Sequence, residues 1–581
     1  MKLIVRDYLK ALREDGELDR LLVDLLSQMG LKIQSSPKKG VAQSGVDLWA
    51  TGKLPKDNEE SVYLVSVKRG NLTRDNWDSG KQAMRPSLNE ILDDFIPHHI
   101  PKRFAGKRIV VCIAIGGEIA SNVQQDVKGF EERAERTHAG LCIREWNGDC
   151  IAGWVCQYLL SAKLFCGEKQ RLFFRALAMV QEPEASLHAF RQFVSHLFQE
   201  PARRSEWVRN ARAGILSLAI LGQYCQDVNN LEASFLGAEY FQLLLWGYVK
   251  RAREKKLVDE KEIISLLVSS LHVVRMCQAR YLSKFALLSD GRYHLSLVVP
   301  GHSILNVNLR LFDLLGRAAS FGLASMFWVR YLEEAGKGGV SRGKMIVETM
   351  RQFIREMIKN NPSLQYPIRD DFSIEISLAA QFLAKMGEHK LLHWWLTHMV
   401  DNIHLSMKLG RPVMCVFKDY PRLVALSRDP GSFKETALPS SEMIPTIAVI
   451  SMALGFSDIY EQLRELVRQY LPATDLQLWY PASDAEEHFF TGGTMYGRQL
   501  VSLPLDEPTR FLEIVLHECE ESPFCLSCGA IAPWLVFSSC RLHRIPVPIH
   551  YWLPLLKKVQ LENEVCTGRS KQSAIPSLQG K

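Results

Sequence analysis

Long hydrophobic runs are scarce in this chain of 581 residues. The longest apolar stretches without a charge are 444–456 and 522–540, and the first is too short to cross a bilayer. The second contains two prolines and four serines, so we expect buried core at both places. The segment 1–7 becomes charged too early for a signal peptide. Neither a membrane protein nor a secreted one is therefore expected.

A disulfide framework and a strong charge imbalance are also missing. The 13 cysteines are odd in number and have no framework spacing, which fits reduced thiols in the cytoplasm. The net charge of +7 is mildly basic, which is compatible with a polyanionic partner without requiring one. We expect a soluble cytoplasmic protein, and the length favours about two to four domains.

Short apolar runs alternate with amphipathic segments over residues 1–165. Apolar residues at helical spacing over 18–26 predict a helix that ends at Gly30. Further helices are expected over 76–94 and 119–136. Strands are expected over 31–34, 46–50, 62–67, 108–115 and 141–146. This order is typical of an α/β sandwich around a mixed sheet.

From residue 166 the apolar residues recur mostly at helical spacing. The clearest helical segments are 215–226, 232–253, 260–284 and 345–359, whereas only 293–299 and 413–416 alternate like strands. We therefore predict two domains, an α/β domain over 1–165 and a mostly α-helical region over 166–581. The helical region would sense a substrate feature, hold a partner or form an oligomer.

Two neighbouring strands carry the residues with the clearest chemistry. Asp47 begins the apolar strand 46–50, and Lys68 ends the strand 62–67. Because side chains alternate along a strand, Ser66 and Lys68 share one face, and pairing of the two strands would bring Asp47 close to both. A divalent cation held by Asp47 would polarise a phosphate and activate water, while Lys68 stabilises the developing charge.

The segments 45–50 (Gly-Val-Asp-Leu-Trp-Ala) and 65–69 (Val-Ser-Val-Lys-Arg) resemble the PD-(D/E)xK nuclease superfamily, and specifically its Mrr-like restriction endonuclease branch. Asp19 precedes Gly30 at the spacing of the acidic residue that this branch carries in its first helix. The resemblance covers about the first 150 residues. It implies a restriction-endonuclease-like sandwich, Mg²⁺ or Mn²⁺ as cofactor, DNA as substrate, and a role in restriction or anti-phage defence.

Ser66 departs from the superfamily pattern, in which Glu, Asp or Gln stands at that position. Serine has no charge and a shorter reach, so the Val67 carbonyl and Asp19 would have to complete the metal site with Asp47. We predict Asp47, Ser66 and Lys68 as the catalytic residues. The alternative is a nuclease fold that has lost its chemistry and serves as a DNA-binding or scaffold subunit. RNA is a third candidate substrate, because the chemistry does not distinguish the two polymers.

The resemblance also implies a helix after the lysine that faces the DNA cleft. Lys81 and Gln82 would contact phosphate from this helix, and Arg69 and Arg85 would belong to a basic rim. An ordinary solvated helix start is the competing interpretation.

A CxxC and a CxxH pair near the C-terminus have a spacing that zinc sites use. The four residues are Cys525, Cys528, Cys540 and His543. Because the segment 529–539 between the pairs is apolar, buried thiols are the favoured interpretation and structural Zn²⁺ the alternative.

Overall fold

The structure is a computed structural model of the whole chain. It describes residues 5–566 except 7–8, 11, 13, 15–17, 36–43, 56, 80–82, 105, 160–167, 202–203, 302, 337, 412–413, 434–435, 482–484, 486–489, 491–496 and 522–533.

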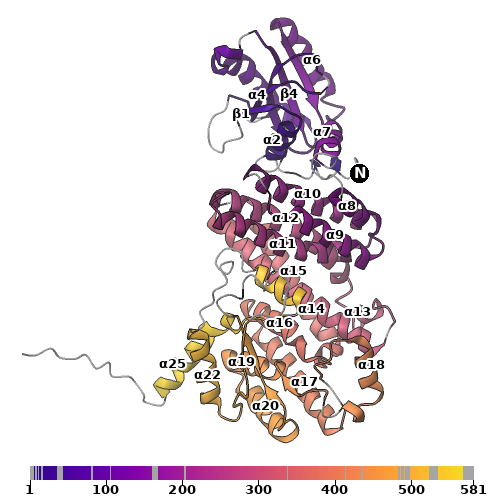
Figure 1. Cartoon of the computed structure of the whole chain (residues 1–581), viewed down its shortest axis with the longest axis vertical. Helices are drawn as coiled ribbons and strands as arrows, with labels where there is room; N and C mark the ends of the chain where they lie inside the picture. The colour runs from indigo at the N-terminus through magenta and orange to yellow at the C-terminus, as the bar shows by residue number, and fades with distance from the viewer. Residues whose placement is uncertain are drawn as a thin grey trace, which may run out of the picture. The chain divides into compact units, whose positions relative to one another are not determined.

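A five-stranded mixed sheet forms the N-terminal part of the chain (Figure 1). Its strands pair in chain order, antiparallel from β1 to β3 and parallel from β3 to β5. The bounds are β1 (Lys32–Ser35), β2 (Leu48–Gly52), β3 (Ser61–Lys68), β4 (Arg108–Ile115) and β5 (Leu141–Trp146). Each strand lies within about two residues of its predicted range, so the mixed sheet is confirmed.

Helices cover the sheet. They are α2 (Asp19–Gln28), α3 (Arg74–Asp78), α4 (Met84–Glu90), the π-helical turn η2 (Ile91–Phe95), α5 (Ile96–His99), α6 (Gln124–Thr137) and α7 (Gly148–Trp154). Val62 and Leu64 of β3 belong to one apolar core with Trp77 of α3, Leu88 of α4 and Val127 of α6. Because side chains alternate along β3, Val62, Leu64 and every second residue lie on the face of the sheet that α3, α4 and α6 cover.

The helix predicted over 76–94 is divided into α3, α4 and η2. Pro86 lies in the first turn of α4. Proline has no N–H to donate, so it is tolerated at a helix start and not in a helix interior. The proline thus explains why a new helix begins close before it.

The rest of the chain is mostly helical, as predicted. Its longer helices are α8 (Glu168–Ala178), α9 (Pro183–Leu197), α10 (Arg204–Asp227), α11 (Glu232–Glu254), α12 (Glu260–Ala286), α14 (Ile304–Glu334), α15 (Val340–Asn360), α16 (Ser373–Lys385), α17 (His389–Lys408), α18 (Tyr420–Arg428), α19 (Met443–Leu454), α20 (Ser457–Tyr470), α22 (Pro508–Glu521), α24 (Trp534–His543) and α25 (Leu553–Cys566). All four of the helices singled out from the sequence are present within longer helices of this set.

The two strands predicted in this region are wrong. The segment 293–299 contains the short helix α13 (His294–Leu297), which Tyr293 precedes with a left-handed φ of 64°. In the segment 413–416, of which residue 413 lies outside the described residues, Cys415 forms an isolated bridge with Arg369 and lies in no strand. Alternation over so few residues cannot distinguish a strand from a short turn packed on a core.

The chain divides into two compact units. The first comprises 1–241 and 248–277, and the second comprises 242–247 and 278–581. The predicted boundary at residue 166, where the secondary structure changes, lies inside the first unit.

Among the described helices, α12 alone is long and apolar enough to cross a membrane by length and composition. Of its most apolar 18-residue window, 56% is buried inside the structure. A core helix of a soluble protein has the same properties.

Candidate functional site

Asp47 lies at the entrance to β2, one residue before the strand. Its N–H donates to the Val65 carbonyl at 3.0 Å, and its Oδ2 accepts the Val67 N–H at 2.7 Å. Leu48 is the first residue of β2 that pairs with β3, opposite Val65, and Asp47 directly precedes this pair with its own N–H bonded to the Val65 carbonyl. The two strands therefore bring together Asp47 and the segment 66–68, as the sequence predicted.

Gly45 sets the direction in which the chain approaches Asp47. Its φ is +76°, and an added Cβ would collide with the Ser87 carbonyl in α4. Only glycine combines a left-handed conformation with so close an approach to another backbone. This is the physical reason for the glycine in the motif.

Lys68 ends β3 with a largely buried side chain, of which 11% is exposed. Its Nζ donates to Glu14 Oε1 at 2.5 Å. Glu14 was not among the predicted site residues, because its spacing does not distinguish it from the other acidic residues in the charged segment 14–19. The ion pair holds the ammonium group of Lys68 at the C-terminal end of β3. The start of β2, next to Asp47, pairs with β3 close to this end.

The carboxyl group of Asp47 has a pKa raised to about 6. Burial is the largest cause, and the negative charges of Glu14 and Asp19 add to it, while the Val67 N–H and the Lys68 ammonium act in the opposite direction. Asp19 is itself buried at the start of α2, and its Oδ1 accepts the Arg20 N–H at 2.6 Å. Three carboxylates and one ammonium thus share this edge of the sheet.

Ser66 is fully buried, and its Oγ has no hydrogen-bond partner in the part of the chain that the structure describes. Val67 contributes its N–H to Asp47. The oxygen donors fit a hard divalent cation by their chemistry. In the described residues, however, no three His, Cys, Asp or Glu side chains are grouped closely enough to hold a metal ion.

Two of the four predicted DNA-binding residues can be located. Arg69 is exposed directly after β3, and Arg85 is partly exposed in α4, where its Nη1 pairs with Asp78 Oδ2 at 2.9 Å. Lys81 and Gln82 lie outside the described residues.

Two of the four residues of the alternative zinc site can be located as well. Cys540 and His543 both belong to α24, where Cys540 is buried. Cys525 and Cys528 lie outside the described residues.

Comparisons with family models, with curated proteins and with solved structures gave no match for this chain. The likeness to the nuclease superfamily therefore rests on the motif residues and on the order of the strands.

Proposed function

We propose that the N-terminal domain is a restriction-endonuclease-like fold of the PD-(D/E)xK superfamily, Mrr-like branch, and that it hydrolyses DNA phosphodiester bonds with a divalent metal ion. The observation that carries the proposal is the hydrogen bond of the Asp47 carboxylate with the Val67 N–H, at the position between Ser66 and Lys68 on β3. Restriction or anti-phage defence in the cytoplasm follows from the same resemblance.

Each side chain has a role that its environment supports. The Val67 N–H holds Asp47 in one orientation, and Asp47 would hold the metal ion with the Val67 carbonyl and Asp19. A bound Mg²⁺ or Mn²⁺ would polarise the phosphate and lower the pKa of water. The Lys68 ammonium would stabilise negative charge that develops on the phosphate.

Glu14 is the residue that the structure adds to this set. It neutralises Lys68 and raises the pKa of Asp47 by charge repulsion. A divalent cation bound beside Asp47 would relieve that repulsion, so the local electrostatics support the proposal.

The decisive experiment is cleavage of plasmid, linear and single-stranded DNA by the purified chain in Mg²⁺ or Mn²⁺, beside Asp47→Asn and Lys68→Met. We expect the rate to fall at least ~100-fold in both variants. The matched controls are Asp93→Asn and Lys102→Met, two exposed positions that should retain the rate. Equal cleavage by all five proteins would overturn the assignment. If the protein cleaved RNA and not DNA, the assignment of the site residues would stand and the substrate would be RNA.

Ser66 favours a second function, a catalytically inactive DNA-binding or scaffold subunit. A buried serine supplies neither the charge nor the reach of the acidic residue that it replaces. Mn²⁺ titration during thermal unfolding separates the two functions, because a ligand that binds only the folded state raises the melting temperature. A rise that Asp47→Asn abolishes supports the enzyme, and no rise in the wild type supports the subunit.

A further inference from the structure

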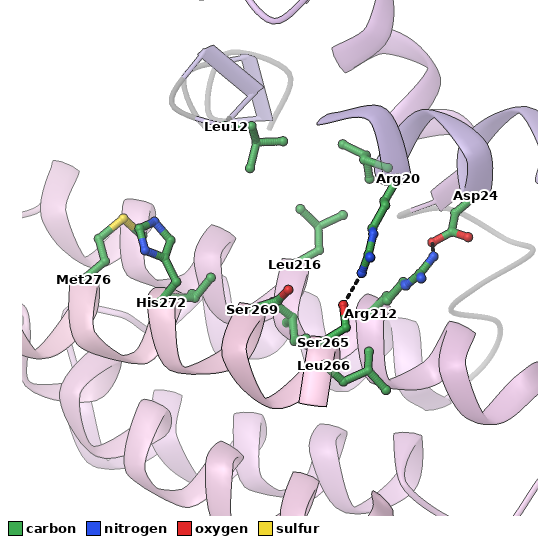
Figure 2. Close-up of a pocket in the computed structure, with 13 residues that line it drawn as sticks. Leu12, Arg20, Asp24, Arg212, Leu216, Ser265, Leu266, Ser269, His272 and Met276 are labelled. Carbon is green, nitrogen blue, oxygen red and sulfur yellow. Dashed lines mark hydrogen bonds and ion pairs between the residues drawn. The ribbon is translucent and has the colours of Figure 1, made fainter. Parts of the chain in front are cut away.

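A cavity of about 110 Å³ lies within the first compact unit, and Asp47 is not among the residues that line it (Figure 2). It is bounded by α2, α10, α12 and Leu12. Most of its wall is apolar, formed by Leu21, Ile215, Leu216, Leu266, Val273 and Met276.

The polar groups at the cavity differ in how they are paired. Arg212 of α10 is held by two carboxylates, Asp24 at 2.6 Å and Glu262 at 2.8 Å. Burial raises the pKa of Asp24 in spite of this partner. Arg212 is therefore neutralised within the protein and has little charge left for a ligand.

Arg20 is the cation that remains. Its guanidinium extends from α2 toward α12 and donates to the Ser265 hydroxyl, a neutral group (Figure 2). Arg20 is exposed at the cavity and has no carboxylate within salt-bridge distance among the described residues, although its charge lowers the pKa of Asp24 from further away. The cavity thus combines an apolar wall with one guanidinium whose charge is not matched by a contacting carboxylate.

We infer that this cavity binds a small molecule with one apolar ring and one anionic group. A dry cavity of about 150 Å³ holds benzene in another protein, so a cavity of this size suits a body of about one small ring. A guanidinium binds carboxylate or phosphate through two parallel N–H donors, so Arg20 would take the anionic group. The shared chemistry is an aromatic anion, with a carboxylate or a phosphate as the charged end.

Because of the position of the cavity, a bound ligand would affect the acidic residues near Asp47. Arg20 is adjacent to Asp19, and Leu12 lies two residues before Glu14, so a single N-terminal segment lines the cavity and supplies acids near Asp47. A ligand would therefore act on the acids of the candidate site. This consequence rests on the proposed nuclease function, whereas binding itself does not.

Binding is tested with benzoate, phenyl phosphate and the neutral benzyl alcohol, by saturation-transfer NMR with the full chain. Ser269 of α12 lines the cavity and is partly exposed, so Ser269→Phe should fill the space without a buried clash. Ser269→Ala is the matched control that leaves the space open. Thermal unfolding of each variant verifies that it is folded.

We expect both anions to bind the wild type and Ser269→Ala, and to bind Ser269→Phe at least ~10-fold more weakly. Arg20→Gln should lose ~10-fold in affinity for the anions and little for benzyl alcohol. Preference for phenyl phosphate over benzoate would identify the ligand as a phosphate. No saturation transfer to the wild type, or equal transfer in Ser269→Phe, would overturn the inference. Because binding is read directly, a failed nuclease assay leaves this result unaffected.

Discussion

At the scale of single residues, the proposed metal chemistry depends most on Ser66. Ser66→Glu would place a carboxylate directly before Val67, whose N–H the Asp47 carboxylate accepts, at the position where the proposed superfamily carries an acid. We expect lower stability without metal, because a second carboxylate is buried beside the first, and a larger rise in melting temperature with Mn²⁺. A tenfold tighter site adds about 1.4 kcal/mol at saturating metal.

The control for this variant is Ser66→Ala. The buried Oγ of Ser66 has no hydrogen-bond partner among the described residues, so its removal should change the free energy of unfolding little. A Mn²⁺ effect in Ser66→Glu no larger than in the wild type would count against a metal site at Asp47.

Asp47 makes a pH-dependent contribution at the same scale. Its pKa is about 6 in the folded protein against an ordinary value of 3.8, so the folded state disfavours the charged form. The resulting loss in free energy of unfolding is absent below pH 3.8, grows as the pH rises, and reaches its full size above about pH 6. Without metal, Asp47→Asn should therefore raise the free energy of unfolding by ~1–3 kcal/mol at pH 8 and change it little at pH 4.

Urea unfolding at the two pH values measures this difference. Asp93→Asn at an exposed position should show no comparable dependence. Equal effects of Asp47→Asn at pH 4 and pH 8 would contradict the raised pKa of Asp47.

At the scale of elements, α19 depends on a buried cap supplied from a distant part of the chain. Asp370 accepts hydrogen bonds from the Ser441 hydroxyl at 2.6 Å, the Glu442 N–H at 2.8 Å and the Met443 N–H at 3.4 Å. These N–H groups at the helix start have no intrahelical partner. We expect Asp370→Ala to lower the free energy of unfolding by ~1–3 kcal/mol, because it leaves buried N–H and O–H donors without an acceptor.

The matched control is Asp419→Ala. Asp419 caps α18 by accepting the Arg422 N–H at 2.9 Å, but it is exposed, so water can replace the lost acceptor. Its removal should cost about 1 kcal/mol or less. Thermal unfolding compares the two variants, and equal losses would refute a special role for the buried cap.

At the scale of the whole molecule, a buried charge network ties the segment after α24 to α16 in the second unit. Arg544 pairs with Asp371 at 3.1 Å and with Glu375, whose side chain is 1% exposed. Burial raises the pKa of Glu375, and Arg544 counteracts this effect. Arg544→Met should lower the free energy of unfolding by ~3–5 kcal/mol, because it removes the arginine that pairs with these buried carboxylates.

The loss should be larger at pH 8 than at pH 5. Without Arg544 the pKa of Glu375 rises further, so the carboxyl is protonated more readily in acid. The free-energy cost of its buried charge is then smaller at the lower pH. The exposed Arg428→Met is the control for removal of an arginine. A pH-independent loss in urea unfolding would contradict this account.

The order of the five strands and the positions of Asp47, Ser66 and Lys68 followed from the sequence. Period-two alternation and turn residues are local signals, and a strand that begins on an acid or ends on a lysine is visible without coordinates. For the same reason the four long helices singled out after residue 166 were predicted, whereas the strands predicted over 293–299 and 413–416 were wrong.

Only the tertiary structure decided which charges meet. The pairing of Lys68 with Glu14 joins residues 54 positions apart, and that of Arg544 with Glu375 joins residues 169 positions apart. No local spacing encodes such contacts, because they depend on how whole elements pack. The burial that raises the pKa of Asp47 and the contact of the Arg20 guanidinium with Ser265 at the cavity have the same origin. The sequence alone determined the helices and strands and the candidate site residues. The packing of these elements determined the burial and the charge partners of those residues.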